Sequence, residues 1–309
     1  MQRDFMQRFR VSRSSRPPEV VNIDKWFEPK VIGALCRLRA AAENEDDPGL
    51  RRLLDVTFSA TVRRVSNADP RLSVPVLSKT GPLAIDSQGV LGVFQSQLEA
   101  NIRRVLQLRT MLPEGVRPIE VASRDARSLG VSFDGSVDLV ITSPPYAGAQ
   151  KYVRSSSLCL GWLGLASTNQ LKPLENESIG REHLSSYLVK QAPVTSVPGA
   201  NLVLENVRRT NPTRAAIAAT YINEMESALT EMSRVLRIGG RIVLIIGNNV
   251  VCGQEFMSSE YLSEILQRLG FRLELALIDD IKSRGLMTKR NKTANLISRE
   301  WVLIFRKDV

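Results

Sequence analysis

Residues 137–146 read Val-Asp-Leu-Val-Ile-Thr-Ser-Pro-Pro-Tyr, an apolar run that ends in a polar pair, two prolines and an aromatic residue. The apolar residues predict a strand covered on both faces, as in a parallel sheet. Neither proline can donate a backbone hydrogen bond, so the strand must end before Pro144. Because chemistry in open α/β sheets collects at the carboxyl ends of strands, we expect a site at residues 143–146.

The residue types at this point also match a known motif. Thr142-Ser143-Pro144-Pro145-Tyr146 resembles the catalytic motif of the amino-group DNA methyltransferases, which transfer a methyl group from S-adenosylmethionine to cytosine N4 or adenine N6. By this resemblance, Ser143, Pro144, Pro145 and Tyr146 would be catalytic residues. The alternative is a simple turn that follows a strand and has no chemical role.

The chemistry explains why such residues are useful. An exocyclic amine is a poor nucleophile because its lone pair is delocalised into the ring. The Ser143 hydroxyl and the Pro144 carbonyl could each accept a hydrogen bond from one amine N–H group, which favours a tetrahedral nitrogen. Tyr146 would stack on a base that is rotated out of the duplex. No metal is required. A neutral serine before the prolines favours cytosine N4 over adenine N6, although both substrates stay open.

An aspartate on a different predicted strand is expected to contact the cofactor. Residues 119–126, Ile-Glu-Val-Ala-Ser-Arg-Asp-Ala, predict a strand that ends in an acid. In folds that bind S-adenosylmethionine this position commonly meets the adenine, so the resemblance assigns Asp125 to its exocyclic amine, with Ala126, Thr142 and Ser143 completing the contacts. A solvated loop aspartate is the alternative.

The expected cofactor site is incomplete. Such enzymes carry a glycine-rich turn after their first strand, and no stretch of this sequence fits that turn. We therefore expect an incomplete Rossmann-like S-adenosylmethionine methyltransferase sheet, of class α/β, that a second polypeptide completes with a glycine-rich strand, turn and helix. Two alternatives stay open: a non-catalytic DNA-binding or specificity protein, and a self-sufficient methylase with an unusual cofactor site or a truncated chain.

Three regions are expected along the chain. Residues 1–20 form a flexible basic tail, residues 21–115 form an α-helical unit, and residues 116–309 form the methyltransferase-like α/β domain. Residues 166–212 are polar and interrupted by prolines, and we expect them to be a DNA-facing loop insertion.

Periodicity and capping residues predict most of the helices and strands. The helical unit should hold three helices: one capped by Asp24, one opened by Asp47-Pro48, and one over 88–112 whose stripe includes Val105. Further helices are expected over 151–165, 213–236 and 258–269, with Gly239-Gly240 stopping the second of these. A strand at 241–249 and an antiparallel pair at 271–281 and 299–306 complete the sheet.

The charge balance favours a polyanionic partner. The 309 residues carry a formal net charge of +10, which suits DNA, although a basic but otherwise ordinary surface is the alternative. The DNA-binding candidates are two basic clusters, formed by Arg208, Arg209, Lys289, Arg290 and Lys292.

Composition limits the other classes. Three widely separated cysteines and a single histidine argue against a disulfide framework and against histidine-based metal chemistry. No apolar run is long enough to span a membrane and no signal-peptide core is present, so we expect a cytoplasmic protein.

Overall fold

The computed structural model describes residues 9, 16–116, 123–130, 134–148, 151–281 and 298–309. The chain divides into two compact units, each described by itself below. The first contains Met1–Pro118 and Tyr152–Glu175, and the second contains Ile119–Lys151 and Asn176–Val309. The expected tail at residues 1–20 lies largely outside the described residues.

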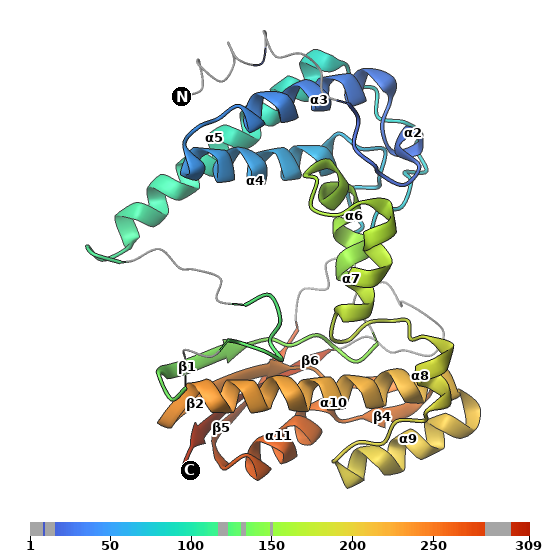
Figure 1. Ribbon diagram of the computed structural model, residues 1–309, viewed down its shortest axis with the longest axis vertical. Coiled ribbons are helices and arrows are strands. Elements are labelled where there is room, and N and C mark those ends of the chain that lie inside the picture. Colours follow the sequence, from blue (N-terminus) through green and yellow to red (C-terminus); the bar gives the residue numbers. More distant parts are fainter. Residues whose placement is uncertain (1–8, 10–15, 117–122, 131–133, 149–150, 282–297) are drawn as a thin grey trace. The chain divides into compact units, whose positions relative to one another are not determined.

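The first unit is helical (Figure 1). Its elements are α2 (Ile23–Trp26), α3 (Pro29–Glu43), α4 (Pro48–Arg64), α5 (Ser87–Met111), α6 (Tyr152–Trp162), the short 3-10 helix η2 (Thr168–Gln170) and most of α7 (Leu171–Glu177). Asp47 caps α4 as expected, since its carboxylate accepts from the Leu50 amide at 2.7 Å. Asp86 caps α5 by accepting from the Gly89 amide at 2.8 Å.

The start of the first helix differs from the prediction. Asp24 lies inside the short helix α2 and does not cap a long helix. Phe27 adopts an extended conformation (φ −143°) that ends α2, and α3 then begins at Pro29. Proline fits the first turn of a helix because the amide that it lacks has no partner there.

An aromatic cluster joins α6 to the helical unit. Trp162 is buried, and its ring lies edge-on to Phe27 at a centroid distance of 5.6 Å and to Phe58 at 6.2 Å. The sequence placed this helix in the α/β domain that begins at residue 116, whereas residues 152–175 group with the helical unit in the structure. Periodicity identifies an apolar helix face but does not say which core the face enters.

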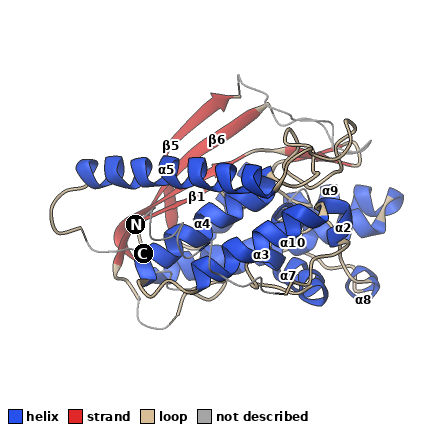
Figure 2. Ribbon diagram, turned by 90° about the horizontal axis from the view of Figure 1, so that it is seen from above, coloured by secondary structure: helices blue, strands red, loops and turns tan. Residues whose placement is uncertain are grey.

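The second unit is built on a mixed sheet, which confirms the predicted α/β class. Its strands are β1 (Val137–Thr142), β2 (Leu236–Ile246), β5 (Phe271–Asp280) and β6 (Arg299–Lys307), in the order β1-β2-β6-β5. The pair β1 and β2 is parallel, and the other two pairs are antiparallel. Figure 2 shows the long antiparallel strands β5 and β6 side by side.

Helices and a small hairpin complete this unit. The helices are α8 (Ser186–Lys190), α9 (Pro198–Thr210), α10 (Pro212–Val235) and α11 (Ser258–Arg268), and the hairpin joins β3 (Asn249–Val251) to β4 (Gln254–Phe256). The predictions for α10, α11 and the antiparallel pair are confirmed. Gly239-Gly240, however, does not stop α10: the helix ends at Val235, and both glycines lie inside β2. At Gly240 a Cβ atom would lie 2.8 Å from the Arg237 carbonyl oxygen, so that position needs glycine.

The expected insertion at 166–212 is largely helical and not a loop. It contains η2, α7, α8 and the thirteen-residue helix α9, whose residues Ala200, Leu204 and Val207 are buried. Pro198 opens α9 at its first turn, a position where proline does not interrupt a helix. Pro198 was expected to interrupt regular structure, and it instead begins a helix.

The two faces of the sheet differ in burial. Alternate residues of β2 and β6, including Ile242, Leu244 and Phe305, are buried in the core that α10 and α11 share. The strand register places a second set of apolar side chains on the opposite side of the sheet, and none of them is buried. We call this set the uncovered face: Leu139, Ile141, Val243, Ile245, Leu275, Leu277, Val302 and Ile304.

The burial of β1 is a correction to the sequence analysis. Leu139 is 48% exposed and Ile141 is 65% exposed, so the strand is covered on one face only. Among the described residues β1 pairs with β2 alone, and no described strand lies along its other edge. That edge borders the uncovered face.

Candidate functional site

The loop after β1 presents one exposed hydroxyl on an anchored backbone. Ser143 is exposed, Pro144 is buried, and Pro145 and Tyr146 are half-buried. The Tyr146 hydroxyl donates to the Glu300 carboxylate at the start of β6. Two prolines and a tethered tyrosine therefore hold the backbone beside a serine that solvent can reach.

A second polar segment lies beside this loop. Asn248 and Asn249 follow β2, whose carboxyl end is adjacent to that of β1 because the two strands are parallel. The Asn249 amide nitrogen donates to the Ala147 carbonyl oxygen at 3.3 Å, and the Ser259 backbone amide donates to Asn248 Oδ1 at 2.9 Å. These contacts join the β2 segment to the β1 loop and to the start of α11.

Both asparagines keep a polar atom without a partner. Asn248 Nδ2 and Asn249 Oδ1 are buried and make no hydrogen bond within the described part of the chain. Buried amide atoms are normally bonded, so each of these two atoms needs a partner, such as a water, that the described residues do not supply. The sequence placed both residues only at the end of a strand. A polar pair directly after the neighbouring buried strand was the signal that could have found them.

Asp125 lies in a turn, and most of the strand predicted before it lies outside the described residues. Residues 119–122 are outside the described residues, and at 123–128 the Ser128 amide donates to the Asp125 carbonyl at 3.1 Å. Arg127 contacts the Asp125 carboxylate with Nε at 2.9 Å and Nη2 at 2.8 Å. These bonds lower the pKa of Asp125, so its carboxylate is an ionised acceptor at neutral pH.

The Asp125 turn and the loop at 143–146 share a core, because Ala126 and Tyr146 both pack against it. Thr142, the last residue of β1, is half-buried. The predicted catalytic residues are thus consecutive on one anchored loop. Asp125 lies on a separate turn that packs against the same core.

A buried ion network holds the Asp125 turn. Arg127 Nη1 lies 3.0 Å from Glu224 on α10, and Arg181 Nη1 lies 2.8 Å from the same carboxylate. The Arg181 side chain is only 9% exposed, and Arg127 also donates to the Glu177 carbonyl at 2.8 Å. Burial raises the pKa of Glu224 despite the two cations. The position of Asp125 therefore depends on a carboxylate in the middle of α10.

The two predicted basic clusters have different outcomes. Lys289, Arg290 and Lys292 lie outside the described residues. Arg208 is occupied within its own unit, because Nη2 donates to the Pro193 carbonyl at 3.2 Å and Nη1 reaches Glu205 at 3.4 Å. Arg209 is 73% exposed and has only a distant Glu205 contact at 3.9 Å. Of this pair, Arg209 is the side chain available to a phosphate.

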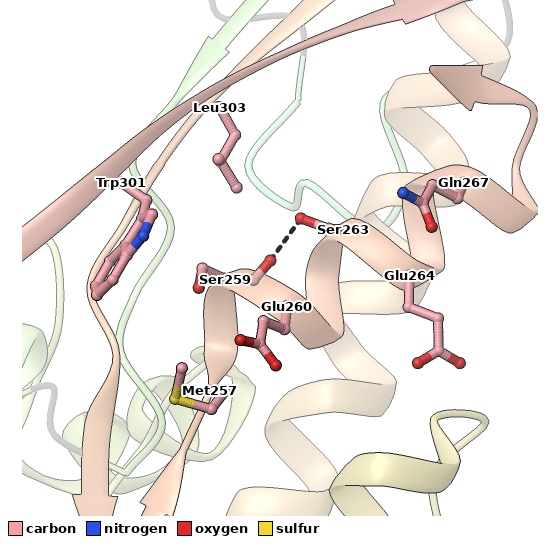
Figure 3. A pocket seen from close by; sticks show the side chains of 8 residues that line it. All are labelled: Met257, Ser259, Glu260, Ser263, Glu264, Gln267, Trp301 and Leu303. Atoms are coloured by element: carbon pink, nitrogen blue, oxygen red, sulfur yellow. Dashed lines mark hydrogen bonds between the residues drawn. The ribbon is translucent and has the colours of Figure 1, made fainter. Parts of the chain in front are cut away.

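A pocket lies between α11 and β6 and includes none of the candidate loop's residues. Its volume is about 420 Å³. Figure 3 shows α11 side chains on one side of it and Trp301 and Leu303 of β6 on the other; the lining residues are Met257, Ser259, Glu260, Ser263, Glu264, Gln267, Trp301 and Leu303. The Ser263 hydroxyl is already bonded to the Ser259 carbonyl at 2.6 Å.

Two other classes of site were sought in the described ranges. These ranges contain no group of three or more histidine, cysteine, aspartate or glutamate side chains that could hold a metal ion. None of their helices is both long and apolar enough to cross a membrane.

Comparison with known proteins gives structural matches only. No protein-family model matches the chain, and no curated protein matches it. Solved structures similar to it include three of one protein from Thermus thermophilus, named as a candidate DNA modification methylase: a selenomethionine derivative, a complex with S-adenosyl-L-methionine, and a third crystal structure. Their identities are 20%, 19% and 20%, with TM-scores of 0.29, 0.30 and 0.30. Each match covers 60% of this chain and 51%, 54% and 52% of the other, so the chain spans about half the length of these structures.

Proposed function

We propose that the chain is the catalytic part of an S-adenosylmethionine-dependent DNA methyltransferase that acts on an exocyclic base amine, with cytosine N4 favoured over adenine N6. The observation that carries this proposal is the exposed Ser143 on a loop anchored by Pro144 and Tyr146, at the carboxyl end of β1. The direct test is incubation with duplex DNA and labelled S-adenosylmethionine, followed by nucleoside analysis. Label in N4-methylcytosine supports the preferred substrate, and label in N6-methyladenine supports the other.

The loop residues have separate roles in this proposal. Ser143 Oγ and the Pro144 carbonyl oxygen each accept a hydrogen bond from one of the two amine N–H groups, which leaves the nitrogen lone pair directed at the methyl donor. Tyr146 stacks on the flipped base. Its hydroxyl bond to Glu300 supports this role, because a tethered ring loses less freedom when the base binds.

The cofactor contacts are proposed from the donors and acceptors that are present. Bound S-adenosylmethionine would supply the methyl group. The ionised Asp125 carboxylate suits an adenine amine, and Ala126, Thr142 and Ser143 would line the same ligand.

The proposal includes a second polypeptide that carries the glycine-rich strand, turn and helix. Two observations support it. The edge of β1 away from β2 is open among the described residues, and the uncovered face offers eight apolar side chains from all four strands. A strand on that edge and helices on that face would bury a large apolar surface, as stable subunit interfaces do.

We expect the purified chain alone to bind S-adenosylmethionine with a Kd weaker than about 1 mM, which corresponds to roughly −4 kcal/mol. A few hydrogen bonds contribute only about 1 kcal/mol each, and immobilising the ligand costs several kcal/mol. Isothermal titration calorimetry measures this. A micromolar Kd from the chain alone would replace the two-polypeptide proposal with a self-contained methylase.

Arg209 is proposed to contact a DNA phosphate. Arg209→Glu should weaken DNA binding at low salt and reduce the slope of log K against log salt by about one, because each phosphate contact releases roughly one counterion. Fluorescence anisotropy over a salt series gives the slope. Arg268→Glu, on α11, is the control, since Arg268 is already paired with Glu226 at 3.1 Å. Equal slopes for Arg209→Glu and the unmodified chain would place the DNA surface elsewhere.

A further inference from the structure

Helix α5 has two halves that differ in burial. In the first half Val90, Phe94 and Leu98 are buried in the helical core. After the half-buried Ile102 the apolar side chains are exposed, with Val105 at 52%, Leu108 at 55% and Leu112, the residue that follows the helix, at 46%. The sequence predicted that Val105 would continue the core stripe, so its exposure is a correction.

Val105, Leu108 and Leu112 continue the buried stripe, whereas the exposed Leu106 and Met111 lie beside it. Leu98, Asn101, Val105, Leu108 and Leu112 recur at alternating steps of three and four residues, which is the seven-residue repeat of a helix that packs against another helix. Asn101 is the last buried member, and its amide donates to the Thr57 hydroxyl at 3.0 Å. Beyond Asn101 the repeat persists without a partner helix among the described residues of the helical unit. We call Val105, Leu108 and Leu112 the α5 seam.

Positive charge borders the α5 seam on both sides. Residues 102–112 contain Arg103, Arg104 and Arg109 and no acid. In the repeat, Arg104 directly precedes Val105 and Arg109 directly follows Leu108, so these two arginines occupy the flanking positions that select a partner helix. In a parallel pair of two copies, Arg104 of one chain would face Arg109 of the other. Like charges therefore disfavour a second copy of this chain.

We propose that the α5 seam docks an acidic amphipathic helix of a partner protein, with apolar residues at the same alternating steps and glutamates at the flanking positions. Apolar burial supplies attraction along the seam, and Arg104 and Arg109 select against basic helices. A DNA duplex satisfies only the arginines, because it would leave the three apolar side chains exposed. The proposal concerns the helical unit and is independent of the proposed methyl transfer.

The test uses the full chain and a synthetic helical peptide of about four heptads. The peptide has leucine at the two apolar positions of each heptad and glutamate at the positions that flank them. The glutamates of two peptides repel one another, which opposes self-pairing of the peptide. A second peptide has lysine in place of each glutamate. By fluorescence anisotropy, we expect the glutamate peptide to bind at least about tenfold more tightly than the lysine peptide, a difference of roughly 1.4 kcal/mol.

Variants then locate the binding surface. Arg104→Glu combined with Arg109→Glu should reverse the preference toward the lysine peptide, and Leu108→Asp should abolish binding of both. The matched control is Arg51→Glu combined with Arg52→Glu, two exposed positions of α4, which should keep the glutamate preference. Because all of these side chains lie at the surface, circular dichroism should show an unchanged fold for each variant.

Three results overturn the proposal. The first is equal affinity for the two peptides. The second is a glutamate preference that survives the double reversal on α5. The third is self-association in sedimentation velocity that Leu108→Asp removes, which would make a second copy the occupant of the seam.

Discussion

Replacing Ser143 by alanine should lower methyl transfer by at least about a hundredfold in the complete assembly, while the chain keeps its fold. The hydroxyl is proposed to accept a hydrogen bond from the reacting amine, and positioned groups of this acid–base kind contribute roughly 10²–10⁴ in rate. The side chain is exposed, so its loss leaves no cavity. Single-turnover transfer of labelled methyl groups to duplex DNA measures the effect without interference from product release.

The control for this experiment is Ser227→Ala. Ser227 lies exposed on α10 and bonds back to the Asn223 carbonyl at 3.1 Å. Its replacement should leave the rate within about twofold, since surface changes of this kind shift free energies by less than about 0.5 kcal/mol. If the Ser143 variant transferred methyl groups as fast as the Ser227 variant, the catalytic role proposed for Ser143 would be lost.

Glu224→Gln should lower the free energy of unfolding by about 3 kcal/mol. The glutamine leaves Arg181, which is almost fully buried, without its countercharge, and removing one partner of a buried ion pair costs roughly 3–5 kcal/mol. The loss is large against a total stability of about 5–15 kcal/mol. Urea denaturation followed by circular dichroism gives the value, read from the midpoint at constant slope.

A neighbouring glutamate on the same helix provides the comparison. Glu226 pairs with Arg268 at 3.1 Å, and both side chains are about one third exposed. Glu226→Gln should therefore cost less than about 1 kcal/mol. If the two variants lost equal amounts of unfolding free energy, burial of the Glu224–Arg181 pair would not be the cause of the Glu224→Gln effect. Because Arg127 links Glu224 to Asp125, the Glu224 variant should also loosen the Asp125 turn.

The sequence by itself determined features whose causes are local. Asp47-Pro48 specifies a helix start for two local reasons. The Asp47 carboxylate caps a backbone amide of the first turn, and Pro48 has no backbone N–H that would need a hydrogen-bond partner there. The antiparallel pair β5 and β6 followed from the alternation of apolar and polar residues. The run at 137–142 followed by two prolines was sufficient to place a strand and an anchored loop.

The tertiary structure alone decided which surfaces meet. Periodicity marks an apolar face but not its partner, so α6 entered the helical core, and Val105 of α5 stayed exposed. Long-range pairing also brought Glu300 to Tyr146 and Asn249 to Ala147, over separations of 154 and 102 residues that no local pattern encodes. Arg208 and Arg209 are adjacent in the chain, yet one bonds a carbonyl and the other faces solvent, because successive helix positions point in different directions.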